Sequence, residues 1–434
     1  MKITGKSGLS FDSYYSPPAD KSISHRSVFF SSLSSNAVKI RNFLFSEDCL
    51  STVKAFQALG VNIDLIDERS LEVSGVGLKG LKAPLGELYL GNSGTTARLI
   101  TGLLSAQSFE TVLIGDNSLS RRPMARVIQP LRLMGADIRG EDNDNLLPVR
   151  IKGGKLKGVE YELPVASAQV KSALLIAGMY AKGKTIIHEP FKSRDHTERM
   201  LKAFEADIKI EGLKTEISFV KQITAQDMFI PGDISSAAFF IALCLLSSDS
   251  RLVIKNVGLN PTRLGFIDVL KRMGGEIEVV CKVKEEESEI YEPYGDIIVT
   301  SSTLNGINVK KEEIPRMIDE LPILFLIASL AKGETYIEGV SELRLKETDR
   351  INSMLVNLKN MGAEMEVDID NIKIRGIKRF KSASLCAFSD HRTAMVSIIA
   401  ALVSKGDFSI DNLDCIKISY PDFLLDVQKI LGDI

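Results

Sequence analysis

The chain has 434 residues, 44% of them hydrophobic and 25% charged, which is the balance of a folded globular protein. Its 54 basic and 56 acidic residues give a net charge of −2, so there is no basic excess of the kind that binds nucleic acid. No apolar run reaches the ~20 residues needed to cross a bilayer, and the N-terminus has no apolar stretch typical of a signal peptide. We expect a cytoplasmic protein with no nucleic-acid or membrane partner.

The length exceeds the ~250–300 residues at which a single core stops growing, so we expect two domains. The cysteines are odd in number and scattered, and the four histidines lack metal-ligand spacing, which argues against a disulfide framework and a metal site. The cysteines are Cys49, Cys244, Cys281, Cys386 and Cys415.

One short pattern recurs along the chain about every 70 residues, counted on the sequence: a helix-like run, a glycine and then an apolar strand start. A glycine at that point fits a left-handed helix C-cap. The copies are Leu59-Gly60-Val61-Asn62-Ile63, Met134-Gly135-Ala136-Asp137-Ile138, a looser Phe204-Glu205-Ala206-Asp207-Ile208, Met273-Gly274-Gly275-Glu276-Ile277, Met361-Gly362-Ala363-Glu364-Met365 and Leu431-Gly432-Asp433-Ile434. Six αβ units in two domains indicate three units in each.

A second repeated feature is a polar cluster before an apolar helical run, and each cluster predicts a helix N-terminus. The clusters are Asp20-Lys21-Ser22, Asn92-Ser93-Gly94-Thr95, Ser167-Ala168-Gln169, Asp233-Ile234-Ser235-Ser236, Asp319-Glu320 and Asp390-His391-Arg392. We expect Ser22, Asn92, Ser167 and Asp233 to cap their helices. The Asp233 cluster has no adjacent cation, so we interpret it as structural. The glycine-ended helices have their own starts, for example at Ser46-Glu47-Asp48.

Short runs rich in β-branched residues predict strands between these helices. They are Val38-Lys39-Ile40, Leu71-Glu72-Val73, Thr111-Val112-Leu113-Ile114, Thr185-Ile186-Ile187, Leu252-Val253-Ile254 and Thr335-Tyr336-Ile337. The run from Leu321 to Leu330 is apolar nearly all round, so its helix should be buried. The segment from Lys284 to Glu289 is expected to be a charged, exposed loop.

Pro17-Pro18 and Pro231-Gly232 mark the predicted domain crossovers. We expect one discontinuous domain of residues 1–19 plus 233–434 and one inserted domain of residues 20–232. The first ~19 residues would then supply a strand to the discontinuous domain.

Several helix starts carry a cation, namely Lys21, Arg26, Arg122, Arg194, Lys346, Arg350 and Arg392. A helix N-terminus attracts anions through its free N–H groups, and arginine suits bidentate binding of carboxylate or phosphate. If these starts converge on a cleft between the domains, the cleft can hold one or two ligands with several negative charges.

Simpler interpretations remain open for single residues. Capping alone would explain any one polar start, and Asp319 and Glu347 could be ordinary first-turn acids favoured by the helix dipole. His196 is expected to cap or hydrogen-bond locally. His391, between two charged residues, is as consistent with a functional role as with a structural one.

At these residues the chain resembles the 5-enolpyruvylshikimate-3-phosphate synthases, members of the enolpyruvyl transferase family. The motifs that carry the resemblance are Asp20-Lys21-Ser22-Ile23-Ser24-His25-Arg26, Gly91-Asn92-Ser93-Gly94-Thr95-Thr96-Ala97-Arg98, Arg122-Pro123, Ser167-Ala168-Gln169-Val170-Lys171-Ser172, Leu345-Lys346-Glu347-Thr348-Asp349-Arg350 and Asp390-His391-Arg392. The resemblance implies an α/β fold of two similar domains, each of three βαβαββ-type units with helices inside and sheets outside. It implies transfer of the enolpyruvyl group of phosphoenolpyruvate to the 5-hydroxyl of shikimate 3-phosphate, with phosphate released and no metal or organic cofactor.

The resemblance also implies roles for individual residues. Those matching the shikimate 3-phosphate positions are Lys21, Ser22, Arg26, Ser167, Ala168, Gln169, Arg194, Asp319 and Lys346. Those matching the phosphoenolpyruvate positions are Lys21, Asn92, Gly94, Arg122, Gln169, Arg350 and Arg392. Asp319 resembles the base that takes the 5-hydroxyl proton, and Glu347 the group that handles the methylene proton. Lys21 and His391 would assist phosphate departure, although which group moves which proton stays open.

The chain departs from the family's pattern at two places. Ala19 stands where the opening motif usually has glycine, and Ile418 stands where some members have lysine; the adjacent Lys417 has no assigned role. Two rival functions are kept. The related UDP-N-acetylglucosamine enolpyruvyl transferases typically have asparagine at the place of Ser22 and a loop cysteine, which the 117–126 segment lacks. A non-catalytic anion-binding repeat protein is the other rival. We expect a monomer.

Overall fold

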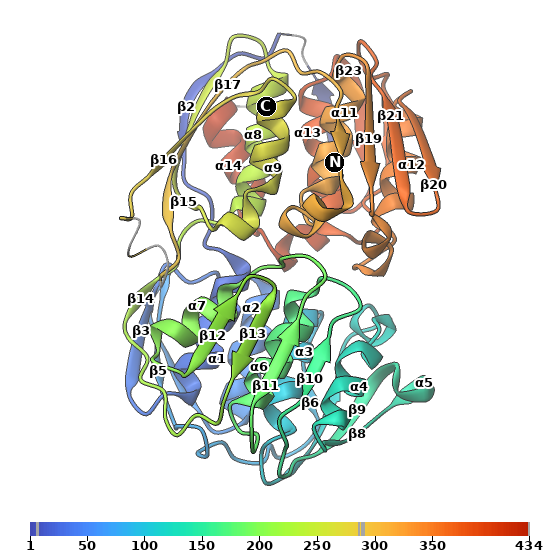
Figure 1. Ribbon diagram of the computed structural model, residues 1–434. Helices are drawn as coiled ribbons and strands as arrows, with labels where there is room; N and C mark the ends of the chain where they lie inside the picture. The colour runs from blue at the N-terminus through green and yellow to red at the C-terminus, as the bar shows by residue number, and fades with distance from the viewer. Residues whose placement is uncertain (6–7, 285–286, 288–290, 433–434) are drawn as a thin grey trace. The chain divides into compact units, whose positions relative to one another are not determined.

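The computed structural model describes residues 1–5, 8–284, 287 and 291–432, which form two compact units (Figure 1). The discontinuous unit contains Met1–Pro18, Pro231–Lys284 and the chain from Pro293 onward. The inserted unit contains Ala19–Ile230 and the described residues of Glu285–Glu292. Of the charged loop expected at 284–289, Lys284 and Glu287 are exposed, and the other residues lie outside the described part of the chain.

The inserted unit has three four-stranded sheets, each with one parallel and two antiparallel strand pairings. In sheet order the strands are β14 (Met228–Phe229), β3 (Ala37–Arg41), β5 (Ser70–Ser74) and β4 (Asn62–Asp67); β6 (Leu88–Tyr89), β7 (Glu110–Ile114), β9 (Leu146–Lys152) and β8 (Asp137–Gly140); and β10 (Glu160–Glu162), β11 (Thr185–His188), β13 (Lys214–Ile217) and β12 (Ile208–Glu211). The helices are α1 (Lys21–Leu33), α2 (Glu47–Ala58), α3 (Gly94–Leu104), α4 (Ala125–Leu133), α5 (Glu141–Asp144), α6 (Ala168–Gly178) and α7 (His196–Ala203).

The discontinuous unit also has three mixed sheets. Their strands are β16 (Glu276–Cys281), β17 (Tyr294–Thr300), β15 (Arg251–Gly258) and β2 (Asp12–Tyr15); β18 (Asn308–Val309), β19 (Glu334–Glu338), β21 (Asn371–Arg375) and β20 (Glu364–Asp368); and β1 (Lys2–Gly5), β23 (Gly406–Ile410) and β22 (Ala383–Leu385). The helices are α8 (Ile234–Leu246), α9 (Gly265–Arg272), α11 (Leu321–Leu330), α12 (Arg350–Asn360), α13 (His391–Leu402) and α14 (Phe423–Leu431).

The N-terminal segment contributes two strands to the discontinuous unit. β2 pairs in parallel with β15, and β1 pairs antiparallel with β23. The chain then enters α1 of the inserted unit, and β14 completes the sheet of β3 before the chain returns. Where the chain passes from one unit to the other, the last strand belongs to the first unit and the helix that follows in sequence belongs to the second. The two cases are β2 followed by α1, and β14 followed by α8.

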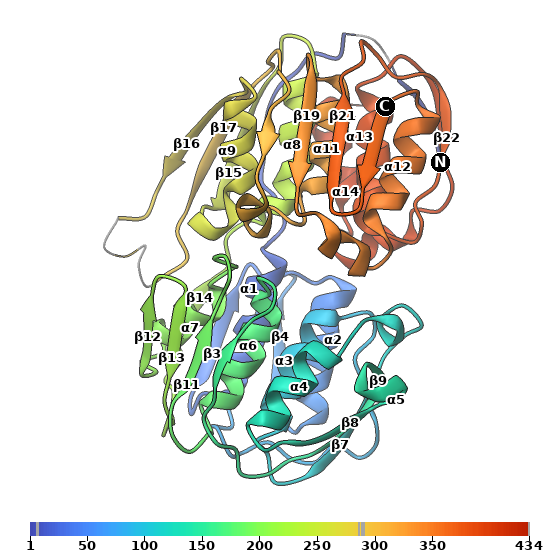
Figure 2. The ribbon, with the colours of Figure 1, turned by 45° about the vertical axis from the view of Figure 1, so that its right-hand side comes forward.

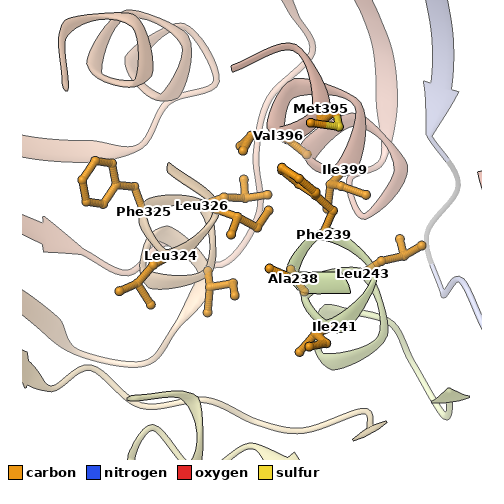
Figure 3. Close-up of a cluster of buried hydrophobic side chains, with 14 of the residues drawn as sticks. Ala238, Phe239, Ile241, Leu243, Leu324, Phe325, Leu326, Met395, Val396 and Ile399 are labelled. Atoms are coloured by element: carbon orange, nitrogen blue, oxygen red, sulfur yellow. The ribbon is translucent and has the colours of Figure 1, made fainter. Parts of the chain in front are cut away.

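The core of each unit lies around its most buried helices. In the discontinuous unit these are α8, α11 and α13, whose apolar side chains meet in one cluster (Figure 3). Phe239 of α8, Leu326 of α11 and Ile399 of α13 belong to it. All residues of α11 except its last are buried, as its apolar composition predicts. α1, α3 and α6 occupy the same role in the inserted unit, with the sheets around them (Figures 1 and 2).

The expected glycine caps and strands are confirmed. Gly60, Gly135, Gly274 and Gly362 follow their helices with φ between 88° and 97°, which is the left-handed region. Glu205 takes this conformation in the loose copy, with φ 62°. The last two residues of the final copy lie outside the described part. All six predicted strands are present, as β3, β5, β7, β11, β15 and β19.

Two of the four predicted caps are wrong. Ser167 and Asp233 accept hydrogen bonds from Val170 N and Ser235 N. The α1 cap, however, is Asp20 instead of Ser22, and the α3 cap is Ser93 instead of Asn92. The cap must be the last residue with extended backbone before the helix, and the polar cluster alone does not show which residue that is.

The Asp233 cluster does have a neighbouring cation. Arg263, which is buried, places Nη2 3.1 Å from Asp233 Oδ1 and donates to Ser235 Oγ at 2.7 Å. Ser235 Oγ in turn donates to Glu320. The cluster has no cation next to it in sequence, but Arg263, 30 residues further along the chain, lies beside it in the fold.

Candidate functional site

The first residue of α1, Lys21, pairs with an aspartate at the start of α2. Lys21 Nζ donates to Asp48 Oδ2 at 2.8 Å, and Asp48 is buried. Burial alone would raise the pKa of the Asp48 carboxyl, but the Lys21 ammonium, with the His25 ring 3.8 Å away, outweighs it and holds that pKa well below its ordinary range. Ser46 caps α2 and so brings Asp48 into the first helical turn. The Lys21 ammonium therefore has a fixed position at the α1 start.

A buried chain of hydroxyls connects α1, α2 and α3. His25 Nδ1 lies 2.6 Å from Thr52 Oγ1, which lies 2.6 Å from Thr96 Oγ1, and Thr96 lies 2.7 Å from Ser93 Oγ. Burial lowers the pKa of His25, so its imidazole is neutral near pH 7. This chain ends at the cap of α3 and orients that helix start relative to α1.

The start of α3 gathers Asn92, Gly94 and Arg122. Arg122 Nη2 donates to Asn92 Oδ1 at 2.5 Å, and Asn92 Nδ2 donates to Asp116 Oδ2 at 2.7 Å. A Cβ added to Gly94 would lie 3.0 Å from Arg122 Nη1, closer than side chains normally pack. Glycine here leaves room for the guanidinium beside the free N–H groups of the helix.

The start of α6 lies against α3. Gln169 Nε2 donates to Thr95 Oγ1 at 3.0 Å, Ser167 caps the helix and Ala168 is its first residue. Six of the residues predicted for phosphoenolpyruvate or shikimate 3-phosphate are thus brought together at two neighbouring helix starts.

Arg26 is buried one turn into α1. Its Nε donates to Thr197 Oγ1 at 2.7 Å, its Nη2 to Ser172 Oγ at 2.9 Å and its Nη1 to the Ser22 carbonyl at 3.0 Å. Burial lowers the pKa of Arg26 to about 10, which leaves it charged at neutral pH. Arg194 is half-buried in the segment before α7.

In the discontinuous unit, Arg350 is surrounded by three carboxylates. The guanidinium is fully buried and donates from Nε to Asp390 Oδ2 at 2.9 Å, from Nη1 to Asp319 Oδ1 at 3.3 Å and from Nη2 to Glu347 Oε2 at 2.5 Å. Burial would lower the pKa of Arg350, but the carboxylates, Asp390 foremost, raise it above its ordinary value. One arginine therefore orients both predicted proton-transfer groups.

Asp319 lies among three cations. Besides Arg350, Lys346 Nζ is 3.6 Å from Oδ1 and Arg392 Nη2 is 3.7 Å from Oδ2. Arg392 also donates to the Asp319 backbone carbonyl at 3.0 Å. His391 is the buried first residue of α13, the helix that Asp390 caps. Five of the six residues predicted for this unit are joined by these contacts, namely Asp319, Lys346, Glu347, Arg350 and Arg392. The sixth, His391, directly precedes Arg392 on α13.

Sequence reasoning missed several partners of these residues. Asp48 is predicted only as part of a helix start, Asp390 and Ser172 stand in family motifs without a role of their own, and Thr197 is not predicted. For Asp390 the available signal in the sequence is an acidic residue two positions before the predicted cation Arg392. His196 does not cap α7, whose cap position is Asp195. Its Nδ1 lies 2.6 Å from Glu292 Oε1, 96 residues away in sequence.

The Lys21–Asp48 pair predicts a pH-dependent stability. The pKa of Asp48 is lower in the folded than in the unfolded chain, so its contribution is present above the ordinary value near 4 and is lost as pH falls below it. We expect Asp48→Asn to destabilise the protein by about 2 kcal/mol at pH 7 and the deficit to shrink below about pH 4. Calorimetric scans from pH 7 to pH 3.5 measure this.

The exposed Asp137 provides the control, since Asp137→Asn should leave the melting temperature nearly unchanged. A deficit of Asp48→Asn that stayed constant down to pH 3.5 would contradict the assignment.

Two features are absent from the part of the chain that the structure describes. No group of three or more histidine, cysteine, aspartate or glutamate side chains there could hold a metal ion. Within the same residues, every helix is too short or too polar to cross a membrane.

The chain is an α/β protein whose helix starts carry several cations, an arrangement that suits small molecules with several negative charges. A family model for EPSP synthase (3-phosphoshikimate 1-carboxyvinyltransferase) matches residues 13–426. The chain belongs to this family. It has the family's activity, a transferase step in the shikimate pathway to aromatic amino acids.

Individual relatives agree with the family match. The chain is 46% identical to a 3-phosphoshikimate 1-carboxyvinyltransferase from Oceanobacillus iheyensis, with 95% of each chain covered. It is 44% identical to the one from Bacillus subtilis, with 95% of this chain and 96% of that one covered. Among solved structures, an EPSP synthase from Acinetobacter baumannii is 41% identical with a TM-score of 0.86, covering 99% of this chain and 98% of that one.

A more distant structure shares the fold alone. The enolpyruvyl transferase NikO from Streptomyces tendae has a TM-score of 0.80 at 19% identity, covering 100% of this chain and 97% of that one. The two rival functions considered from the sequence are therefore set aside in favour of the EPSP synthase activity.

Proposed function

We propose that the chain transfers the enolpyruvyl group of phosphoenolpyruvate to the 5-hydroxyl of shikimate 3-phosphate and releases phosphate. The observation that carries this proposal is the arrangement around Arg350, where one buried guanidinium holds both Asp319 and Glu347. Two carboxylates fixed by one cation suit a reaction with two separate proton transfers.

Shikimate 3-phosphate is proposed to bind at the starts of α1, α6, α7 and α11. The residues proposed to hold it are Lys21, Ser22, Arg26, Ser167, Ala168, Gln169, Arg194, Asp319 and Lys346. The capped ends of α1 and α6 support this, because their free N–H groups and partial positive charge attract an anion.

Phosphoenolpyruvate is proposed to bind at the starts of α3 and α12. Its charged groups would meet Asn92, Gly94, Arg122 and Gln169 in the inserted unit and Arg350 and Arg392 in the discontinuous unit. We propose that Lys21 contacts both substrates, and that the two sets of residues act on the same substrate pair.

The reaction is proposed to proceed by addition and then elimination. Asp319 takes the proton of the 5-hydroxyl while the oxygen of that hydroxyl bonds to C2 of phosphoenolpyruvate. Glu347 delivers a proton to the methylene carbon of phosphoenolpyruvate. In the second step Glu347 removes a proton from the resulting methyl group as the C2–O bond to phosphate breaks. Lys21 and His391 stabilise the departing phosphate, since a cation and an imidazole oppose its growing charge.

A phosphate-release assay tests the proposal. The purified chain should release phosphate from phosphoenolpyruvate when shikimate 3-phosphate is present, and not when UDP-N-acetylglucosamine replaces it. Mass spectrometry should show the acceptor gaining one enolpyruvyl group. Release with UDP-N-acetylglucosamine, or with neither acceptor, would reject this substrate assignment.

The finer features of the family are proposed for this chain as well. We infer repeated βαβαββ units with helices inside and sheets outside, with the division at residues 1–19 plus 233–434 and 20–232. We also propose a monomer that works in the cytoplasm. The five cysteines, all within the described residues, are free thiols, which supports a reducing compartment.

A further inference from the structure

The inserted unit contains a buried ion triad that the proposed mechanism does not use. Lys171 Nζ lies 2.8 Å from Glu189 Oε2 and 2.6 Å from Glu198 Oε1, and all three side chains are fully buried. Lys171 belongs to the first turn of α6, Glu198 to α7 and Glu189 to the segment after β11. One ammonium therefore joins three separate pieces of chain.

The residues next to this triad form a second link. Ser172 Oγ and Thr197 Oγ1 lie 2.7 Å apart, and Arg26 of α1 donates to both. Lys171 and Ser172 are neighbours on α6, as are Thr197 and Glu198 on α7. We call the whole set the buried charge node, formed by Arg26, Lys171, Ser172, Glu189, Ser193, Thr197 and Glu198.

The node also closes the segment that leads to Arg194. Ser193 donates to Glu189 Oε1 from its backbone N at 3.2 Å and from its hydroxyl. Glu189 thus binds Lys171 through Oε2 and Ser193 through Oε1. Because Ser193 directly precedes Arg194, the Glu189 carboxylate helps to fix the position of Arg194.

Stability alone does not account for such a node. Burial raises the pKa of Glu198, which disfavours its charged form. Burial also disfavours the charged form of Lys171, but Glu198 and Glu189 outweigh this effect and raise the pKa of Lys171. Apolar side chains of similar volume are often as stabilising as a buried ion pair. Charges with fixed partners do restrict how three helices can be placed, and that is the property an anion site requires.

We propose that the buried charge node is a positioning device for shikimate 3-phosphate, setting the spacing among the helix starts of α1, α6 and α7. This inference depends on the proposed function, which assigns Ser22, Ser167 and Arg194 to that substrate. Lys171, Glu189 and Glu198 are positioning residues, because their partners are one another and not the reacting groups.

The node predicts a separation between the two substrates. Gly94 begins α3, Asn92 precedes that helix, and Arg122 lies in the segment before α4. Arg122 donates to Asn92 and Ser118, and Asn92 donates to Asp116. Of the residues proposed for phosphoenolpyruvate, Lys21 and Gln169 lie on helices that the node joins, and the others lie elsewhere. Loss of the node should therefore weaken shikimate 3-phosphate binding more than it raises the KM for phosphoenolpyruvate. A general loosening of the fold would affect both equally.

The test uses the full chain with Lys171→Met and Glu198→Gln combined, which keeps side-chain volume and leaves Glu189 with its Ser193 donors. Calorimetric titration with shikimate 3-phosphate should show a dissociation constant raised about tenfold or more. The KM for phosphoenolpyruvate, at saturating shikimate 3-phosphate, should change less than about threefold. Lys184→Met is the matched control, because it removes an exposed ion pair with Glu216 from the same unit.

Ser193→Ala is measured alongside, since it removes one hydroxyl and does not depend on folding of the charge variant. It should raise the dissociation constant about threefold. Folded variants that bind shikimate 3-phosphate within twofold of the unmodified chain would overturn the proposal. An equal rise in both substrate constants would overturn it too. If the charge variant does not fold, an unchanged constant for Ser193→Ala overturns it. An inactive unmodified chain would instead refute the proposed function.

Discussion

Replacing Asp319 with asparagine is expected to lower kcat by about 10²-fold or more while shikimate 3-phosphate still binds. Asparagine keeps the size of the side chain but cannot accept the 5-hydroxyl proton. Three cations lie around the carboxylate, so they stabilise its charged form as a base. The same cations stay in place in the variant and can still hold an anionic substrate. Phosphate release gives kcat, and calorimetric titration gives the dissociation constant.

The control is Asp268→Asn, which changes an aspartate on the surface of the same unit that pairs with Arg316. Its kcat should match that of the unmodified chain. Turnover of Asp319→Asn within about threefold of normal would show that another group takes the proton. Loss of both turnover and binding would show that Asp319 acts in binding instead.

Replacing Arg350 with methionine is expected to destabilise the discontinuous unit by about 3–5 kcal/mol and to abolish activity. The variant leaves three carboxylates together without their shared guanidinium, and Asp390 is completely buried. Their mutual repulsion and desolvation are no longer offset. Differential scanning calorimetry should show one unfolding transition moved to a much lower temperature.

Arg375→Met is the matched control for this variant. Arg375 also pairs with two carboxylates, Glu334 and Glu364, but its side chain is exposed at the C-terminal end of β21. Exposed pairs contribute little because water solvates both partners, so the control should melt near the normal temperature. Equal shifts for the two variants would contradict a central structural role of Arg350. An intermediate shift is expected for Arg350→Lys, because one ammonium cannot serve all three carboxylates.

Much of the local architecture could be predicted because it depends on neighbours in sequence. The left-handed glycines after α2, α4, α9 and α12 follow from the need to end a helix without a Cβ clash. The strands follow from β-branched runs and the burial of α11 from its apolar circumference. The cations at Lys21, Arg122, Arg350 and Arg392 could be found for the same reason, since each lies within or just before a helix start.

Partners distant in sequence could not be predicted in this way. Arg263 reaches Asp233 from 30 residues away, and His196 meets Glu292 across 96 residues. Such pairs depend on how strands are ordered in the sheets and on which helices they bring side by side. Lys171 illustrates this, since the motif that contains it suggested substrate binding while its ammonium is fully buried between two glutamates.

The sequence by itself determined the repeated helix and strand pattern, the helix starts with their cations and the family resemblance that indicated the reaction. Each of these is encoded within a few consecutive residues, where backbone sterics, capping and apolar periodicity act. Only the tertiary structure decided which residue caps each helix, that Arg350 is shared by Asp319, Glu347 and Asp390, and that a buried charge node joins α1, α6 and α7. Those outcomes depend on distances between side chains far apart in the chain, and packing of the whole unit sets those distances.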